Sequence, residues 1–351
     1  MEEARSYGSE HDTAVRTARM IDMARIAHQI VTVNSWVRVG EAVLIICDHE
    51  VSPMIVEALA QQVYVVGALP LVMRMPSQAV HGQELPAAVA AAMRQVQVTY
   101  AVVSRSITHT RASQEARKAG VRNLGFSNIT EDAMLHGAAT ADPLVLREIG
   151  AKLRTRLLNS KSVRVTSDLG TDVVFSVAGR RVRVGDGVIP QDAGYGLPSD
   201  NLPDNSRMFP DGEVYCCPLE ETVEGTIVID RWVQGIGVLT EPMTWRFQSG
   251  KCVSISGGFQ ALALERLLTD RGDQYSHYLG EFAIGTNPSA RSDGNPHREG
   301  KKVLGAVHFA LGTGINTGGK YQSTLHLDGT MSPPRIFIDN DLIFDRGHLL
   351  I

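Results

Sequence analysis

The hydrophobic pattern of this 351-residue chain changes near residue 160, and that change limits the folds the chain can adopt. In the first part, apolar runs of strand length alternate with segments whose apolar residues follow a helical period. The expected strands cover residues 41–48, 69–75, 98–105 and 121–127, and the expected helices cover 14–36, 52–67, 84–96, 111–120 and 130–160. Strands that alternate with helices at this spacing predict a parallel sheet with helices on both faces.

The second part has the pattern of antiparallel strands. Segment 162–185, SVRVTSDLGTDVVFSVAGRRVRVG, alternates polar and apolar residues around a turn near Gly170, which is typical of a hairpin. Short strands and turn residues dominate from there onward, apart from a helix expected over 259–270. We therefore expect an α/β chain with an N-terminal doubly wound parallel-sheet domain, residues 1–158, and a C-terminal β-rich α+β metal-binding domain, residues 159–351.

The composition argues against several classes of partner. A formal net charge of −4 gives no reason to expect nucleic acid or an anionic membrane surface. The four cysteines show no CxxC spacing and the N-terminus has no apolar signal segment, so we expect reduced thiols in a cytoplasmic protein. The first part has neither GxGxxG after a strand nor a P-loop, and we expect it to be a scaffold.

The second part carries a set of side chains that metal ions prefer. His326 and Asp328 are two residues apart, a spacing that places both side chains on one face of a strand. Glu281 in LGEFAIG and His308 in AVHFALG interrupt apolar strands, where a charged group needs a partner ion. The candidate metal ligands are Glu213, Glu281, His308, His326 and Asp328. Such donors can hold two divalent ions (Zn, Mn or Co), bridged by the aspartate, that activate a water molecule.

Each of these residues also has a purely structural interpretation. A lone histidine in a strand is commonly a hydrogen-bonded core residue, and a glutamate can protect a sheet edge from aggregation. Glu213 follows the Asp211–Gly212 turn and can simply open a strand. The presence of all five in one β-rich domain favours the metal site.

The glycine-rich segment 312–324, GTGINTGGKYQST, separates His308 from His326. No helical pattern follows it, so it lacks the context of a phosphate-binding P-loop. We expect the segment to lie over the metal site, where Lys320 and Tyr321 reach the substrate or a developing oxyanion. The alternative is an ordinary hairpin loop.

These segments resemble the aminopeptidase T family of metallopeptidases, the thermophilic leucyl aminopeptidase type. The resemblance covers the second part through PDGEVYCCPLEE, LGEFAIGTNPSA, VLGAVHFALG and HLDGTM, in this order. It implies a two-domain protein, often dimeric, with two metal ions bound by the five candidate ligands. It also implies that Glu281 is the base that takes a proton from metal-bound water. The family's oxyanion-stabilising tyrosine falls on Ile315, so Tyr321 is the candidate replacement.

A second branch, the 2,5-dihydroxypyridine 5,6-dioxygenases, resembles the same region. That resemblance implies one Fe(II) held by two histidines and an aspartate, which here would be His277, His326 and Asp328. A set of two histidines and one carboxylate suits oxygen activation on a hydroxylated ring. Glu213 and Glu281 favour the peptidase-type site, whereas the presence of His277 favours the dioxygenase as the alternative.

We therefore expect first a metal-dependent hydrolase of aminopeptidase type that acts on a small peptide or amide, with Glu281 and Tyr321 as catalytic residues. The alternative is a mononuclear Fe(II) ring-cleaving dioxygenase acting on a hydroxylated aromatic substrate. A third interpretation is a binding module with a vestigial site, since Ile315 replaces the family tyrosine. A homodimer is expected, because β-rich domains expose strand edges that pair with a second copy.

Overall fold

The computed structural model describes residues 2–191, 202–295 and 298–351. The chain divides into two compact units, which comprise the described parts of Met1–Pro143 with Gly187–Pro210, and of Leu144–Asp186 with Asp211–Ile351. The boundary expected from the sequence, 158/159, lies at the end of a helix that belongs to the second unit. Leu153 and Leu157 of this helix are fully buried in the core of that unit.

The first unit is an α/β layer structure, as the alternating pattern predicts. Its helices are α1 (Glu2–Gln29), the π-helix η1 (Ile30–Asn34), α2 (Pro53–Val65), α3 (Ala87–Met93), α4 (Arg111–Lys118), α5 (Glu131–Leu135) and the 3₁₀ helix η2 (Gly137–Thr140). Its strands are β1 (Ala42–Cys47), β2 (Leu69–Arg74), β3 (Val98–Val102), β4 (Arg122–Gly125) and β8 (Ser206–Met208). They form one sheet in the order β2-β1-β3-β4-β8, and each neighbouring pair is parallel.

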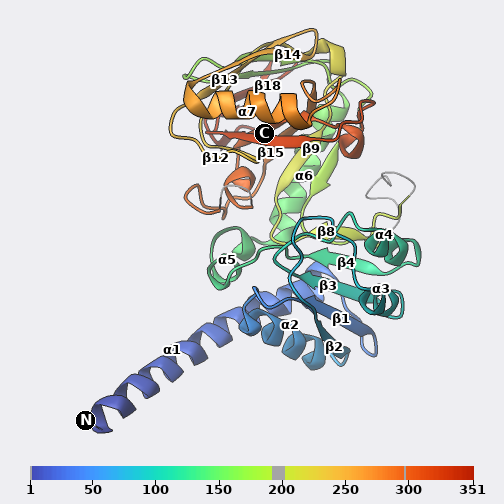
Figure 1. The fold of residues 1–351 in the computed structure, drawn as a ribbon, viewed down its shortest axis with the longest axis vertical. Helices are drawn as coiled ribbons and strands as arrows, with labels where there is room; N and C mark the ends of the chain where they lie inside the picture. The colour runs from blue at the N-terminus through green and yellow to red at the C-terminus, as the bar shows by residue number, and fades with distance from the viewer. Residues whose placement is uncertain (1, 192–201, 296–297) are drawn as a thin grey trace. The chain divides into compact units, whose positions relative to one another are not determined.

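Alternate residues of β1 enter two different cores, which shows that the sheet is covered on both faces. Val43 and Ile45 pack in a cluster with residues of α1 and α2, whereas Leu44 and Ile46 pack with residues of α3 and α4. Figure 1 labels β1 and these four helices in the ribbon of the first unit. Side chains of consecutive strand residues point to opposite faces, so a continuous apolar run is what a doubly covered strand requires. The fold class predicted for this unit is confirmed.

Two features of the first unit differ from the sequence expectation. The helix expected over 14–36 begins already at Glu2, because no proline interrupts residues 2–13, and it ends in the π-helical turn η1. In addition, β8 returns from far along the chain to pair with β4. Three residues are too few to show a periodicity, so the sequence gives no sign of this strand.

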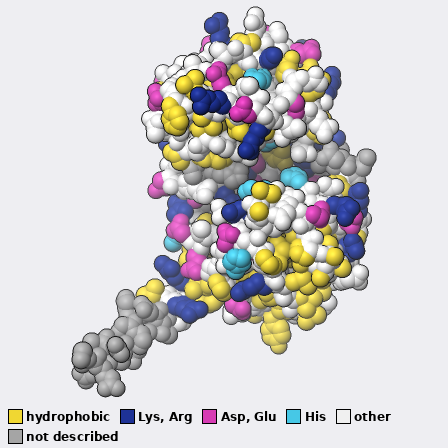
Figure 2. Space-filling model, viewed as in Figure 1, with side chains coloured by type: hydrophobic (Ala, Val, Ile, Leu, Met, Phe, Trp, Pro, Cys, Tyr) yellow, Lys and Arg dark blue, Asp and Glu magenta, His cyan; other side chains and the backbone are white. Residues whose placement is uncertain are grey.

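The sheet of the first unit ends in an exposed apolar edge. Leu69, Leu71 and Val72 of β2 are each at least 40% exposed, and Tyr64 and Val65 at the end of α2 are more exposed still. Figure 2 shows hydrophobic side chains gathered over this end of the unit.

Within the described residues, no helix is both long enough and apolar enough to cross a membrane.

The second unit is built mainly from antiparallel strands. Its helices are α6 (Pro143–Leu158), α7 (Gly258–Arg271) and the 3₁₀ helices η3 (Glu220–Thr222), η4 (Gly300–Lys302) and η5 (Ile315–Thr317). Its strands are β5 (Val163–Thr166), β6 (Asp172–Phe175), β7 (Arg183–Gly185), β9 (Glu213–Cys216), β10 (Glu224–Ile229), β11 (Trp232–Val233), β12 (Gly237–Val238), β13 (Met243–Gln248), β14 (Lys251–Ser256), β15 (Leu279–Gly285), β16 (Val307–Gly312), β17 (His326–Met331), β18 (Arg335–Ile338), β19 (Asp341–Asp345) and β20 (His348–Leu349).

These strands form two sheets that enclose one hydrophobic core. One sheet has the order β14-β13-β10-β6-β5-β18-β19-β20, and the other has the order β12-β11-β17-β16-β15-β9-β7. Phe175 of the first sheet stands 5.0 Å from Phe282 of the second, measured between ring centroids. Both sheets contribute fully buried side chains to the same cluster, so the second unit is a two-layer β structure with α7 beside it.

A close approach between the sheets occurs at Gly329 of β17. A methyl group added there would meet the ring atom Cη2 of Trp245 at 2.5 Å, and Trp245 is fully buried. The glycine therefore lets β17, which carries two of the expected metal ligands, lie directly on the indole. Close-packed cores respond to an added methyl group by straining side chains or backbone.

We expect Gly329→Ala to destabilise the protein by about 1–3 kcal/mol because of this clash. Urea unfolding followed by circular dichroism measures the loss. In a Trp245→Phe background the clashing ring atoms are absent, so the same change should cost clearly less. An equal cost in both backgrounds would show that the indole is not the cause.

Asp273, two residues after α7, holds the chain that leads into β17. Its Oδ2 accepts a 2.6 Å hydrogen bond from the backbone N–H of Thr324, and its Oδ1 accepts one of 2.9 Å from that of Tyr275. The Thr324 N–H, with that of Tyr275, lowers the pKa of Asp273 to about 2. The ionised carboxylate thus fixes the entry of β17.

Because the folded-state pKa is depressed, Asp273 stabilises the fold fully above its unfolded-state pKa of about 3.9, and this stabilisation is lost as the pH falls through about 2. Asp273→Asn should therefore reduce the free energy of unfolding near neutral pH, by at most about 1 kcal/mol for such a partly exposed group. Urea unfolding between pH 6 and pH 3 measures the difference in the free energy of unfolding between wild type and variant. We expect this difference to become smaller as the pH falls. A difference that stays constant would refute this role.

Candidate metal centre

Four adjacent strands bring the predicted ligands to one face of a sheet. Glu213 opens β9, Glu281 lies in β15, His308 in β16, and His326 and Asp328 in β17. The register pairs Glu281 with Ala310 and Ala310 with Asp328, so these three residues form one row across the sheet. Their sequence neighbours point the other way: Phe282, Phe309 and Leu327 lie in the hydrophobic core.

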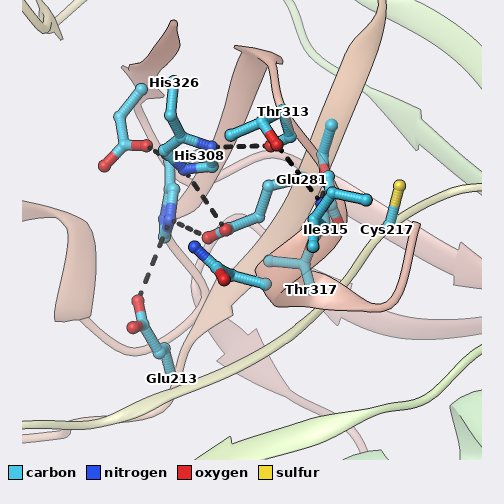
Figure 3. Close-up of polar contacts among 12 residues, drawn as sticks. Glu213, Cys217, Glu281, His308, Thr313, Ile315, Thr317 and His326 are labelled. Atoms are coloured by element: carbon cyan, nitrogen blue, oxygen red, sulfur yellow. Dashed lines mark hydrogen bonds and ion pairs between the residues drawn. The ribbon is translucent and has the colours of Figure 1, made fainter. Parts of the chain in front are cut away.

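The five side chains meet on this face, and Figure 3 labels four of them: Glu213, Glu281, His308 and His326. His308 Nε2 lies 3.0 Å from Glu281 Oε1 and 3.8 Å from Glu213 Oε2. His326 Nε2 lies 3.4 Å from Glu281 Oε2 and 3.2 Å from Asp328 Oδ1. Glu281 therefore stands between the two imidazoles, and the predicted set of five is brought together in space.

The ring of His326 is oriented by the segment that follows β16. Its Nδ1 lies 2.9 Å from the backbone carbonyl oxygen of Thr313, which can only accept a hydrogen bond. In the neutral imidazole the proton is therefore on Nδ1, and Nε2 presents its lone pair towards Glu281 and Asp328. A backbone carbonyl that fixes the outer nitrogen is the usual support for a metal-binding histidine.

Two lysines of η4 neutralise part of the cluster's negative charge. Lys301 Nζ lies 2.7 Å from Asp328 Oδ2. Lys302 Nζ lies 2.7 Å from Asp211 Oδ1 and 2.5 Å from Glu213 Oε1. Lys302 and Asp211 are buried, and such groups are tolerated in a protein interior only when paired.

Ion pairing outweighs burial at the centre of the cluster. Burial alone would raise the pKa of Glu281, but the imidazoles of His308 and His326 hold it well below its usual value. Burial would lower the pKa of His326, but Asp328 and Glu281 raise it well above its usual value. Burial also opposes ionisation of Asp328, yet Lys301 and His326 keep its pKa well below the usual range.

The donor set fits a metal cation, although the side chains are engaged with one another. Within the described residues, no three His, Cys, Asp or Glu side chains form a preformed metal cage. Two buried carboxylate oxygens of the cluster, Glu213 Oε2 and Asp328 Oδ1, nevertheless make no hydrogen bond. Each faces an imidazole nitrogen, and buried polar atoms without a partner are rare in native proteins. A cation bound among these nitrogen and oxygen donors would satisfy them.

The structure does not bring His277 to this cluster. Its backbone carbonyl accepts a 2.8 Å hydrogen bond from Cys252 of β14, and its side chain lines a shallow cavity of about 340 Å³ with Lys251 and Glu265. Burial, with the nearby charge of Lys251, lowers the pKa of its half-buried imidazole. The contacts of the described residues join His277 to neither His326 nor Asp328.

Tyr321 also lies apart from the predicted ligands. Its hydroxyl donates a 2.9 Å hydrogen bond to Glu221, which raises the pKa of Tyr321 to about 12. Its ring stacks on Tyr275 with 4.3 Å between centroids. Ile315, which replaces the tyrosine of the resembled family, lies in η5 next to Thr313 (Figure 3). The contacts of the Tyr321 side chain thus join it to Glu221 and Tyr275, and its role at the cluster stays a prediction.

Sequence reasoning missed Asp211, Lys301 and Lys302. A pair of lysines in a polar stretch looks like solvated surface charge, and Asp211 looks like a turn residue before Gly212. A signal was nevertheless present, because three buried carboxylates demand more positive charge than two histidines supply. The pair Lys301–Lys302 lies six to seven residues before His308 and was the nearest source of that charge.

Comparisons with known proteins point to one family. A family model described as 2,5-dihydroxypyridine 5,6-dioxygenase matches residues 24–351. The 2,5-dihydroxypyridine 5,6-dioxygenase of Pseudomonas putida KT2440 is 24% identical over 213 residues, or 56% of this chain, so the matched part spans only 56% of that relative's length.

Two solved structures have a similar fold. The 2,5-dihydroxypyridine dioxygenase from Pseudomonas putida KT2440 aligns over 93% of this chain and 96% of its own, with a TM-score of 0.69 and 17% identity. Wild-type AmpT from Thermus thermophilus aligns over 94% of this chain and 99% of its own, with a TM-score of 0.65 and 17% identity. At this level of identity, both similarities concern the fold alone.

These findings correct the function expected from the sequence. The aminopeptidase-like fold is confirmed, but the hydrolase of aminopeptidase type is wrong, because the family model and the curated relative both describe a dioxygenase. The similarity to AmpT does not extend to its activity. The match over residues 24–351 shows that the chain belongs to the 2,5-dihydroxypyridine 5,6-dioxygenase family.

Proposed function

We propose that this protein is an iron(II)-dependent dioxygenase that opens the ring of a dihydroxypyridine or a related hydroxylated aromatic compound. The family and the names of its relatives support the reaction class. The observation that carries the proposal is the cluster on β15, β16 and β17, where two imidazoles alternate with two carboxylates at 3.0–3.4 Å. Two histidines with carboxylate are the donors that non-haem iron(II) oxygenases use.

The residues that we propose to hold the iron are His308, His326, Glu281 and Asp328. His326 and Asp328 belong to the iron set expected from the sequence. Glu281 and His308 replace His277, the third member of that set. Iron(II) bound there would supply the activation of oxygen next to the hydroxylated ring.

The remaining parts of the site support and shield these four residues. Thr313 orients His326, and Lys302 holds Glu213 beside His308. His308 is fully buried, while the side chain of His326 is 34% exposed. We infer that a small ring substrate approaches from the side of His326, and that the His308 side excludes water and so strengthens the electrostatic contacts there.

The homodimer expected from the sequence stays a prediction. The exposed apolar edge β2 supports it, because an unpaired strand edge with Leu69, Leu71 and Val72 on it favours pairing with a second copy. Sedimentation equilibrium should give twice the mass of one chain, whereas a single-chain mass at micromolar concentration would contradict it.

Oxygen uptake tests the proposed reaction. Protein loaded anaerobically with Fe(II) should consume oxygen when 2,5-dihydroxypyridine is added. His326→Ala and Glu281→Ala should each lower the rate by about 100-fold or more, because each removes a proposed ligand. His277→Ala is the matched control and should change the rate little, since His277 lies in a separate cavity.

Two results would overturn the assignment. An unchanged rate in His326→Ala would remove the cluster from the reaction. A rate abolished by His277→Ala in folded protein would return the iron to the set expected from the sequence. Circular dichroism of each variant checks that the fold is intact.

A further inference from the structure

The ammonium group of Lys301 lies where the expected two-metal site would require a second cation. In that site, Asp328 would bridge two ions through its two carboxylate oxygens. Here Asp328 Oδ1 faces His326 at 3.2 Å, whereas Oδ2 lies 2.7 Å from Lys301 Nζ. The oxygen that would bind the second ion is thus already used by a side chain of the protein.

The charges of the site lead to the same conclusion. Asp211, Glu213, Glu281 and Asp328 contribute four negative charges, and Lys301 and Lys302 contribute two positive charges. Two negative charges remain when both imidazoles are neutral, which is the number that one divalent ion balances. A second divalent ion would leave a buried excess of positive charge, which is strongly unfavourable.

The backbone of η4 packs closely against the end of β15. A methyl group added at Gly285 of β15 would lie 2.2 Å from the carbonyl oxygen of Val303 and 2.9 Å from that of Lys301. The backbone N–H of Asn287 donates a 2.9 Å hydrogen bond to the carbonyl oxygen of Lys302. The absence of a side chain at Gly285 therefore lets η4 lie directly on the end of β15 and direct both lysines into the cluster.

We propose that Lys301 is a built-in cation that replaces a second metal ion and restricts the site to one. The inference rests on the metal site of the proposed function, but it does not depend on the reaction that the metal performs. Lys301 acts through Asp328, whose second oxygen it occupies, and is therefore a positioning residue. It sets the number of ions and leaves Asp328 one free oxygen for the ion that binds.

Counting bound Mn(II) tests this directly. Metal-free wild-type protein is titrated with Mn(II), free Mn(II) is measured by electron paramagnetic resonance, and bound metal is confirmed by elemental analysis. Wild type should bind one ion per chain. Lys301→Met should bind two, with the second ion held on the order of 100-fold more tightly than by wild type, because the competing ammonium is gone. The pair of ions should also show a spin-coupled spectrum, which a general loss of structure would not produce.

Two controls separate charge from position. Lys301→Arg keeps the positive charge and should still bind one ion, and Lys251→Met removes an exposed lysine of β14 outside the cluster and should also bind one. Lys301→Gln repeats the test with a polar side chain if the methionine variant fails to fold.

Several results would overturn the proposal. A count of two ions per chain in wild type would be enough to overturn it, even if no Lys301 variant folds. One ion bound by folded Lys301→Met and Lys301→Gln would show that Lys301 does not exclude the second. Since the count needs no substrate, one ion in wild type and two in Lys301→Met would support the proposal even if no oxygen uptake were found.

Discussion

Four carboxylates lie close together on one largely buried face of the second unit, at β9, β15 and β17, and β16, β17 and η4 supply the cationic partners that they need. The strands bring two imidazoles to the same face, and η4 delivers two ammonium groups from the side. Desolvation of an unpaired carboxylate costs far more than any single packing interaction returns. Gly285 lets η4 approach the sheet closely enough for its lysines to reach the carboxylates, and the Thr313 carbonyl orients His326 towards them.

Much of the site was predictable because strand geometry is simple. The two-residue spacing of His326 and Asp328 predicts that both lie on one face of a strand, as they do in β17. The apolar surroundings of Glu281 and His308 predict that each needs a charged partner, and the two lie 3.0 Å apart. The presence of a parallel-sheet unit followed by a β-rich unit was also predictable, because the hydrophobic period changes along the chain near residue 160. By contrast, the sequence does not predict that ligands from β9, β15, β16 and β17 lie close together, because this depends on the order of the strands in the sheet.

What could not be predicted depends on irregular backbone. His277 shares the parity of Glu281, but the register shifts between Leu279 and Glu281, and His277 ends beside β14 instead. Tyr321 belongs to a glycine-rich segment whose path is set by tertiary contacts with Glu221 and Tyr275. The function was mispredicted for a different reason: the same ligand types on the same fold serve either hydrolysis or oxygen chemistry, so fold and residue type do not identify the reaction.

The position of β8 has a consequence for how the chain is made. Its three residues complete the parallel sheet of the first unit, yet they follow residues 144–186, which belong to the second. On the ribosome, the N-terminal sheet therefore lacks its last strand until residue 208 has been synthesised and has left the exit tunnel. By then β5, β6 and β7 of the second unit have already emerged, and β5 can pair with β6. Their other partners, β18, β10 and β9, have not emerged. The two units must thus be completed in an interleaved order, which leaves strand edges exposed during synthesis.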